Sequence, residues 1–227
     1  MKLDLKKLKL RKVNEKLQNF DRKQNDRDFT IINPEGNHAV CAGLTEEINI
    51  NIKGHVGYYC AGMNQKASVT IDGNVGTGVA ENMMSGKVHV KGNASQSAGA
   101  TAHGGLLIID GDASSRCGIS MKGVDIVVKG SVGHMSGFMS QSGNLVVCGD
   151  AGEALGDSLY ETNIYIGGDV KSLGADCVQK KMDKKHIKKL ELLLKEANIK
   201  NHKAESFKRY GSARKLYNFK IDNISNY

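Results

Sequence analysis

Short runs of alternating apolar and polar residues recur along the middle of this chain at a constant spacing. Examples are INIKG, VTIDG and VHVKG, each of which ends at a glycine. Alternation of this kind predicts short β-strands. The closing glycines are 19 residues apart, and no residue is gained or lost between them. They are Gly54, Gly73, Gly92, Gly111, Gly130, Gly149 and Gly168.

A fixed repeat of this length predicts a stack of similar coils. When the repeats are aligned, three positions stay apolar for seven turns and are therefore expected to point inward. Parallel crossovers are strongly biased to the right hand, and left-handed β-helices usually run on a six-residue repeat. The sequence thus predicts an all-β fold, a right-handed parallel β-helix of about seven 19-residue coils. The three inward ladders begin at Ile50, Ile52 and Val56 and end at Ile164, Ile166 and Val170.

The repeated glycines are interpreted as structural turns. Each is followed by His, Asn, Asp or Ser, and these residue types tolerate tight-turn geometry. The segment 29–40, before the first repeat, is expected to be an irregular first coil or cap.

Two outward-facing ladders differ in character. One reads Lys53, Asp72, Lys91, Asp110, Lys129, so its charge changes sign at every turn. Strands in a sheet lie about 4.8 Å apart, so each charge is predicted to lie between two opposite ones.

The later half of the other outward ladder is apolar, and we call it the outer stripe. An apolar stripe on an outer face needs a cover. The sequence leaves two covers open, the chain's own C-terminal helix or a partner subunit. The outer stripe consists of Ile108, Val127, Val146 and Tyr165.

Charge divides the chain into three parts. Residues 1–27 hold ten Lys/Arg and four Asp/Glu, a net +6, and form a basic N-terminal arm. Residues 28–177, the predicted β-helix, hold eight against fifteen, a net −7. Residues 178–227 hold fourteen against five, a net +9. Basic arms can bind nucleic acid. The basic residues of these arms are not interleaved with aromatic residues for base stacking, and the arms have no Gly/Arg-rich run, so contact with an acidic surface, of this chain or a partner, is favoured.

Both arms carry helix patterns. Asp183 is a possible N-cap for a helix over 183–199, whose apolar face holds Ile187, Leu190, Leu194 and Ala197. A second short helix is expected around Val13, Leu17 and Phe20. The tail 210–219 is basic and aromatic and is expected to dock, with Tyr210, Arg214 and Tyr217 as candidate contacts.

Composition bears on the cellular location of the protein and on the cysteine sites it can form. No stretch approaches the roughly 20 apolar residues of a membrane span, and the N-terminus lacks the apolar run of a secretory signal. The five cysteines show no CxxC spacing, which disfavours disulfide frameworks and cysteine-ligated clusters and favours a reduced, cytoplasmic protein.

The candidate reactive residues do not form a constellation. GNVGTG, 73–78, is followed by strand rather than helix, so a phosphate-binding loop is disfavoured. His103 and His134 lie alone on loops, and Glu81 and Asp157 are four turns apart. We therefore assign no catalytic, cofactor-binding or metal-binding residue.

One loop, GYYCAGMN at 57–64, departs from the repeat. It brings together Tyr58, Tyr59 and Met63. We take these three residues as candidate interface positions, with a cap on the coil stack as the alternative.

These glycine-spaced coils, with the strings GYYCAGMN, SSRCGISMKG, GEALGDS and YGSARKLYNF, resemble the GXGXG family. That family includes the C-terminal β-helix domain of the glutamate synthase large subunit and one of the subunits of formylmethanofuran dehydrogenase. The non-repetitive strings are more similar to the glutamate-synthase-like subunit of N-methylglutamate synthase (methylamine–glutamate N-methyltransferase). The resemblance covers roughly residues 28–222.

The resemblance implies a non-catalytic structural subunit of a glutamate-synthase-type complex. Its partners would be a class-II glutamine amidotransferase-like subunit and an FMN-dependent synthase subunit, with FMN and an iron–sulfur cluster bound by the partners and none by this chain. The chain has Lys2 where a class-II glutaminase needs cysteine as its mature first residue. The alternatives are a GXGXG subunit of a formylmethanofuran dehydrogenase-type or other glutamate synthase complex, and a free-standing nucleic-acid-binding solenoid.

Overall fold

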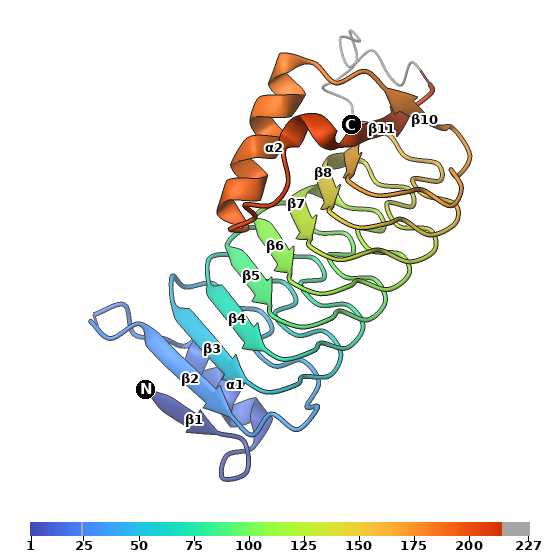
Figure 1. The fold of residues 1–227 in the computed structure, drawn as a ribbon. Coiled ribbons are helices and arrows are strands. Elements are labelled where there is room, and N and C mark those ends of the chain that lie inside the picture. The colour runs from blue at the N-terminus through green and yellow to red at the C-terminus, as the bar shows by residue number, and fades with distance from the viewer. Residues whose placement is uncertain (24, 215–227) are drawn as a thin grey trace, which may run out of the picture.

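The computed structural model describes residues 1–23 and 25–214, and these form a stack of coils with one strand in each coil (Figure 1). Neighbouring repeat strands pair in parallel, and from β3 to β9 partners such as Ile50 and Val69 are 19 residues apart, except at the start of β7, where Lys122 pairs with Ser142. The predicted parallel β-helix of about seven coils is confirmed. The repeat strands are β3 (Asn49–Lys53), β4 (Ser68–Asp72), β5 (Lys87–Val90), β6 (Leu106–Ile109), β7 (Lys122–Val128), β8 (Ser142–Val147) and β9 (Asn163–Ile166).

Both ends of the sheet are extended by the arms. At the N-terminal end, β2 (Asp28–Ile32) forms a first coil, and β1 (Lys2–Asp4) pairs with it in parallel. At the other end, β11 (Lys208–Ser212) lies between β9 and β10 (Cys177–Lys180) and is antiparallel to both. The helices of the described residues are α1 (Leu10–Gln18), α2 (Lys184–Glu196) and a short 3₁₀ turn, η1 (Ala204–Ser206).

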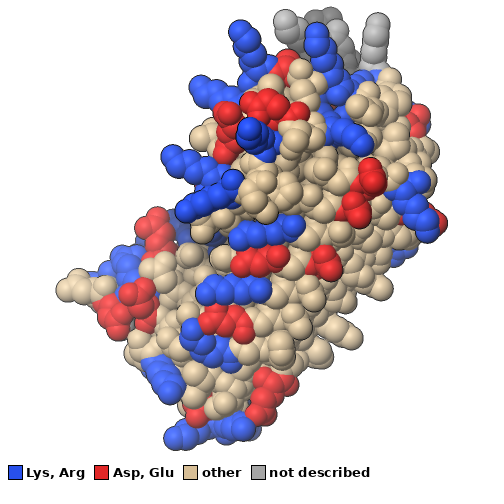
Figure 2. All heavy atoms as spheres, in the orientation of Figure 1, with Lys and Arg blue, Asp and Glu red and all other residues tan. Residues whose placement is uncertain are grey.

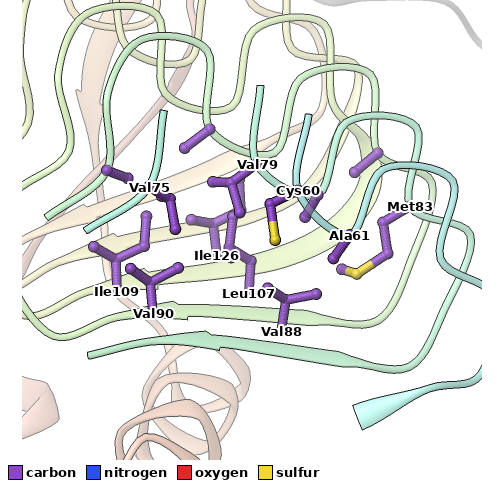
Figure 3. Packing of buried hydrophobic residues seen from close by; sticks show 14 of the residues in the cluster. Cys60, Ala61, Val75, Val79, Met83, Val88, Val90, Leu107, Ile109 and Ile126 are labelled. Atoms are coloured by element: carbon purple, nitrogen blue, oxygen red, sulfur yellow. The ribbon is translucent and has the colours of Figure 1, made fainter. Parts of the chain in front are cut away.

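The interior of the stack is filled by the three predicted ladders. All members of the two strand ladders are buried, and the third ladder forms parallel bridges from Val56 through to Val170. Figure 3 shows strand residues such as Val90 and Leu107 facing Val79 and Cys60 from the loop side. Side chains therefore occupy the interior from both sides, as in a close-packed core.

The repeated glycines lie at the bend that follows each strand, and they also allow close approach of successive coils. Among the seven, only Gly54 has a positive φ, of 123°. A Cβ atom on Gly111 would lie 2.0 Å from the Oδ1 of Asn93, and one on Gly130 would lie 2.1 Å from the Oδ1 of Asp112. From Gly92 to Gly168, a side chain at the repeated glycine would occupy the space of a side-chain acceptor oxygen from the preceding coil.

That acceptor belongs to a ladder of side-chain hydrogen bonds. From His55 to Asp150, the residue after the repeated glycine accepts from the backbone N–H of its equivalent one coil later. For example, Asn93 Oδ1 accepts from Asp112 N at 2.8 Å, and Asp112 Oδ1 accepts from Ser131 N at 2.8 Å. His, Asn, Asp and Ser recur here because each can present an acceptor. The ladder runs through His55, Asn74, Asn93, Asp112, Ser131, Asp150 and Asp169.

The predicted charge ladder forms on the outer face of the sheet, where rows of opposite charge alternate (Figure 2). Asp72 pairs with Lys53 and, at 3.0 Å, with Lys91, while Asp110 pairs with Lys129 at 2.8 Å. Within the described residues no ion pair joins Lys91 to Asp110. Exposed pairs of this kind stabilise a protein by about 1 kcal/mol at most, so the ladder reports the register of the coils.

We predict that Gly111→Ala lowers the free energy of unfolding by about 2 to 4 kcal/mol. The new Cβ would displace Asn93 Oδ1 and leave the N–H of Asp112 unpaired. Denaturant unfolding followed by circular dichroism measures the change. Gly211→Ala is the matched control, because its Cβ would meet nothing closer than Lys180 Cγ at 3.4 Å. Equal stability of the two variants would contradict the close-approach argument.

Candidate interaction surface

The side of each coil opposite the strands is a loop with alternate residues in the left-handed backbone region. In the loop 57–65 these are Tyr59, Ala61 and Met63, with φ of 58°, 53° and 56°. Their backbone N–H groups bond alternately to the next coil and the preceding one: Tyr59 N to Thr77 O, Ala61 N to Val40 O, and Met63 N to Glu81 O. Ala61 is buried, whereas Tyr59 and Met63 are exposed, so this backbone sets which side chains face outward.

The three candidate residues of GYYCAGMN lie on the surface. Tyr58 and Tyr59 are each 50% exposed and Met63 is 54% exposed. The Tyr58 ring stacks on His38, with centroids 4.4 Å apart and planes 16° apart, and it meets the ring of Tyr59 edge-on at 6.3 Å. The N–H of Tyr58 donates to His38 Nδ1 at 2.9 Å. Contact with the neighbouring coil thus fixes Tyr58 without burying it.

Further large apolar side chains are exposed on later loops, and sequence reasoning missed them. Met139 occupies the coil position of Met63 four repeats later, and Tyr160 likewise repeats the position of Met84. The 19-residue spacing would have identified both pairs. We call the whole set the loop-side ridge. It consists of Tyr58, Tyr59, Met63, Met84, Met139 and Tyr160, all at least 36% exposed.

Charge is unevenly distributed on the loop side. The loops 57–65, 95–105 and 133–143 contain no Lys, Arg, Asp or Glu, whereas the loops between them contain Glu81, Arg116, Lys122, Glu153, Asp157 and Glu161. In Figure 2 the corresponding side, on the right, is mostly tan, whereas charged side chains crowd the region of α2. Tyr58, Tyr59, Met63 and Met139 are exposed in the uncharged loops. Exposed Met and Tyr with few charges beside them have the composition of the centre of a protein–protein interface.

The outer stripe, by contrast, is buried under the chain's own C-terminal helix. Ile108 is 1% exposed and Val127, Val146 and Tyr165 are fully buried. They form one cluster with Leu190 and other residues of α2, and the predicted helix face packs on them. Of the two covers left open, the structure therefore has the intramolecular one, and these four candidate interface residues are occupied within the chain. Burial also raises the pKa of Tyr165 to about 12.

Two polar contacts hold α2 in place. Lys189 Nζ lies 2.8 Å from Asp125 Oδ2 on β7. At the start of the helix the predicted N-cap is confirmed, because the Asp183 side chain accepts from the N–H groups of Lys185 and His186 and the His186 ring accepts from Asp183 N. The helix thus has a satisfied first turn and one ionic anchor on the sheet.

The tail candidates are placed only in part. Tyr210 lies in β11 and is buried in the interior cluster, so it seals the end of the coil stack. Arg214 forms an ion pair with Asp176. Tyr217 lies outside the described residues.

The thiols offer no nucleophile. Burial raises the pKa of Cys60 and Cys117 to about 12, of Cys148 and Cys177 to about 11, and that of Cys41 well above its usual value. Thiols with raised pKa values stay protonated and unreactive at neutral pH. All five behave as small buried apolar residues.

The acids and histidines also stay apart. Asp157 accepts from the hydroxyl of Ser158 at 2.7 Å and from the N–H of Ala175 at 3.3 Å, so it stabilises its own loop. His103 and His134 are exposed. Within residues 1–23 and 25–214, no three His, Cys, Asp or Glu side chains gather into a group that could hold a metal ion. Over the same residues, no helix has the length and apolar character needed to cross a membrane.

Comparison with known proteins gives one informative relative. The chain is 58% identical over 225 residues to Protein GlxC of Rhizobium meliloti (strain 1021), and the match covers 99% of each chain. No protein-family model matches the sequence.

We predict that Val146→Asp releases α2 while the coil stack stays folded. A carboxylate beneath the helix would be buried without a partner, which lowers the local stability of α2 by about 3 kcal/mol or more. Hydrogen exchange of the amides of 184–196 reports this opening. Leu192→Asp, at a position 51% exposed on the same helix, is the control and should change the protection by less than about 0.5 kcal/mol. Unchanged protection in Val146→Asp would contradict the covering role.

The docking of α2 should weaken in mild acid. Burial and then Arg209 lower the pKa of His186 below 6.5, against the opposing effect of Asp183. The unfolded chain therefore binds the proton more tightly, and stability falls as the pH drops below about 6.5. His186→Gln keeps an acceptor for the N–H of Asp183 but does not titrate. Hydrogen exchange of α2 at pH 7.5 and 5.5 should show a loss in the wild type that the variant lacks.

Proposed function

The chain belongs to the same family as Protein GlxC, and on this premise we propose that it is a structural, non-catalytic subunit of a glutamate-synthase-type complex. The observation that carries the proposal is the loop-side ridge, an exposed Met- and Tyr-rich surface on a rigid coil stack. Surfaces of this composition serve contacts between proteins. The filled interior and the buried, protonated thiols support a role in assembly rather than in chemistry.

The finer proposal is N-methylglutamate synthase. Its support is the resemblance of GYYCAGMN, SSRCGISMKG, GEALGDS and YGSARKLYNF to the glutamate-synthase-like subunit of that enzyme. The partners proposed are a class-II glutamine amidotransferase-like subunit and an FMN-dependent synthase subunit, which would bind the FMN and the iron–sulfur cluster. The complex would work in the cytoplasm on glutamate and methylamine. This chain would hold the other subunits in register.

Within the loop-side ridge, we propose Tyr59 and Met63 as the residues that bind a partner. Tyr59 and Met63 project from left-handed backbone positions that are fixed by bonds to the next coil. Their exposed side chains can therefore bind a partner without the ordering cost of a flexible loop. Anchors of this kind often dominate the binding energy of an interface.

We predict that the double variant Tyr59→Asn, Met63→Asn reduces recovery of the partner subunits at least tenfold in affinity purification from the native cell. Asparagine removes the apolar surface but tolerates a left-handed backbone, so the coil should remain folded. Leu192→Asn, on α2, is the control and should leave recovery unchanged. Equal recovery of partners by the ridge variant and the wild type would reject the ridge as the docking surface.

The same preparations test the function. The purified complex should turn over glutamate with methylamine, and the isolated chain should not. Turnover by the isolated chain would refute the structural role. Co-purification of a molybdenum or tungsten subunit would instead favour the formylmethanofuran dehydrogenase-type alternative.

A further inference from the structure

A recess of about 340 Å³ is lined by residues of β9, β10 and β11 and by the segment before β9. β10 and β11 lie at the C-terminal end of the coil stack (Figure 1). We call this recess the C-terminal recess. Its lining includes the basic side chains of Lys180, Arg209 and Arg214 and the acidic side chain of Glu161. Tyr160 of the loop-side ridge also lines the recess, whereas the outer stripe and its cover contribute none of the lining residues.

Arg209 is held rigidly but is not neutralised. Its Nε donates to the carbonyl of Lys181 at 3.0 Å, and its Nη1 donates to Asn163 Oδ1 at 2.9 Å. A guanidinium has five N–H donors, so these two bonds orient the group and leave three. Among residues 1–23 and 25–214, no carboxylate lies within 4.0 Å of Arg209. A fixed, unneutralised guanidinium favours an anionic oxygen ligand.

Lys180 supplies a second available charge. Lys180 lies directly opposite Arg209 in the register of β10 and β11. Over the described part of the chain, Lys180 forms no ion pair. Arg214 is already paired with Asp176, so the balance of the lining is Lys180 and Arg209 against Glu161, a net +1. The recess is therefore biased toward a singly or doubly charged anion.

A glycine leaves space in the recess beside Lys180. Gly211 lines it, and a Cβ atom there would meet only Lys180 Cγ at 3.4 Å, Lys180 Cε at 3.9 Å and Thr162 O at 3.9 Å. The missing side chain leaves room beside the lysine. Thr162 also lines the recess, is 2% exposed, and has an Oγ1 atom with no hydrogen-bond partner among the described residues.

We propose that the C-terminal recess binds a carboxylate or phosphate group, with Arg209 and Lys180 as its cationic ligands. The group could belong to a free small molecule or to an acidic side chain of another protein. The chemistry is the same in both cases, because the guanidinium and the ammonium donate to anionic oxygens.

The test is isothermal titration of the full chain with three probes: inorganic phosphate, glutarate and a blocked tetraglutamate peptide. Saturable binding of at least one probe is expected, weakening as salt is added. Lys180→Gln should weaken it at least fivefold, and Gly211→Val, which fills the recess, should abolish it. Lys203→Gln removes a lysine elsewhere and should change nothing. Thermal unfolding of each variant establishes that it is folded.

The probes also separate the two sources. Tighter binding of the peptide than of glutarate assigns the recess to an acidic protein segment, and the reverse assigns it to a small anion. Absence of saturable binding for all three probes would overturn the proposal. So would equal weakening by Lys180→Gln and Lys203→Gln, because that pattern reports general attraction to the basic arm.

Discussion

Contact between equivalent glycines of successive coils is the constraint on which the rest of the structure depends. From Gly111 onward, each repeated glycine donates its N–H to the carbonyl of the glycine one coil before, at 2.9 to 3.1 Å. The next residue extends this contact through its side-chain acceptor. Because this geometry leaves no space for a Cβ, the register cannot slip without a collision. The apolar ladders, the charge ladder and the outward positions of the loop side all follow from that register.

The two outer faces of the stack differ in whether their apolar residues are covered. The strand face has an apolar outer stripe, and α2 covers it, leaving the surface above it basic. The loop face has no such helix in the described residues, and the loop-side ridge stays exposed. The chain thus separates an electrostatic surface from an apolar one. Such a division suits a subunit that meets more than one neighbour, because charge and apolar area select different surfaces.

The repeat made most of the fold predictable, because the residues of each ladder recur at one constant spacing in the sequence. Asp183 and the apolar face of α2 were likewise visible in the sequence. The role of Gly111 was not, because a glycine needed for turn geometry and one needed for close approach look alike. Burial of Val146 under α2 required knowing which of two covers is used. β11 inserts antiparallel between β9 and β10, and these segments share no periodicity. The sequence pattern therefore did not predict this pairing.

That insertion determines which part of the coil stack can form last during synthesis. Coils that contact only their neighbours can form one after another as the chain leaves the ribosome. The last coil is different, because β10 reaches the sheet only through β11, which is made about 30 residues later. Tyr210, on that late strand, closes the interior. The growing stack therefore exposes an open end until residues 208–212 have been synthesised, and a ribosome stalled before them would present a sheet edge able to recruit other chains.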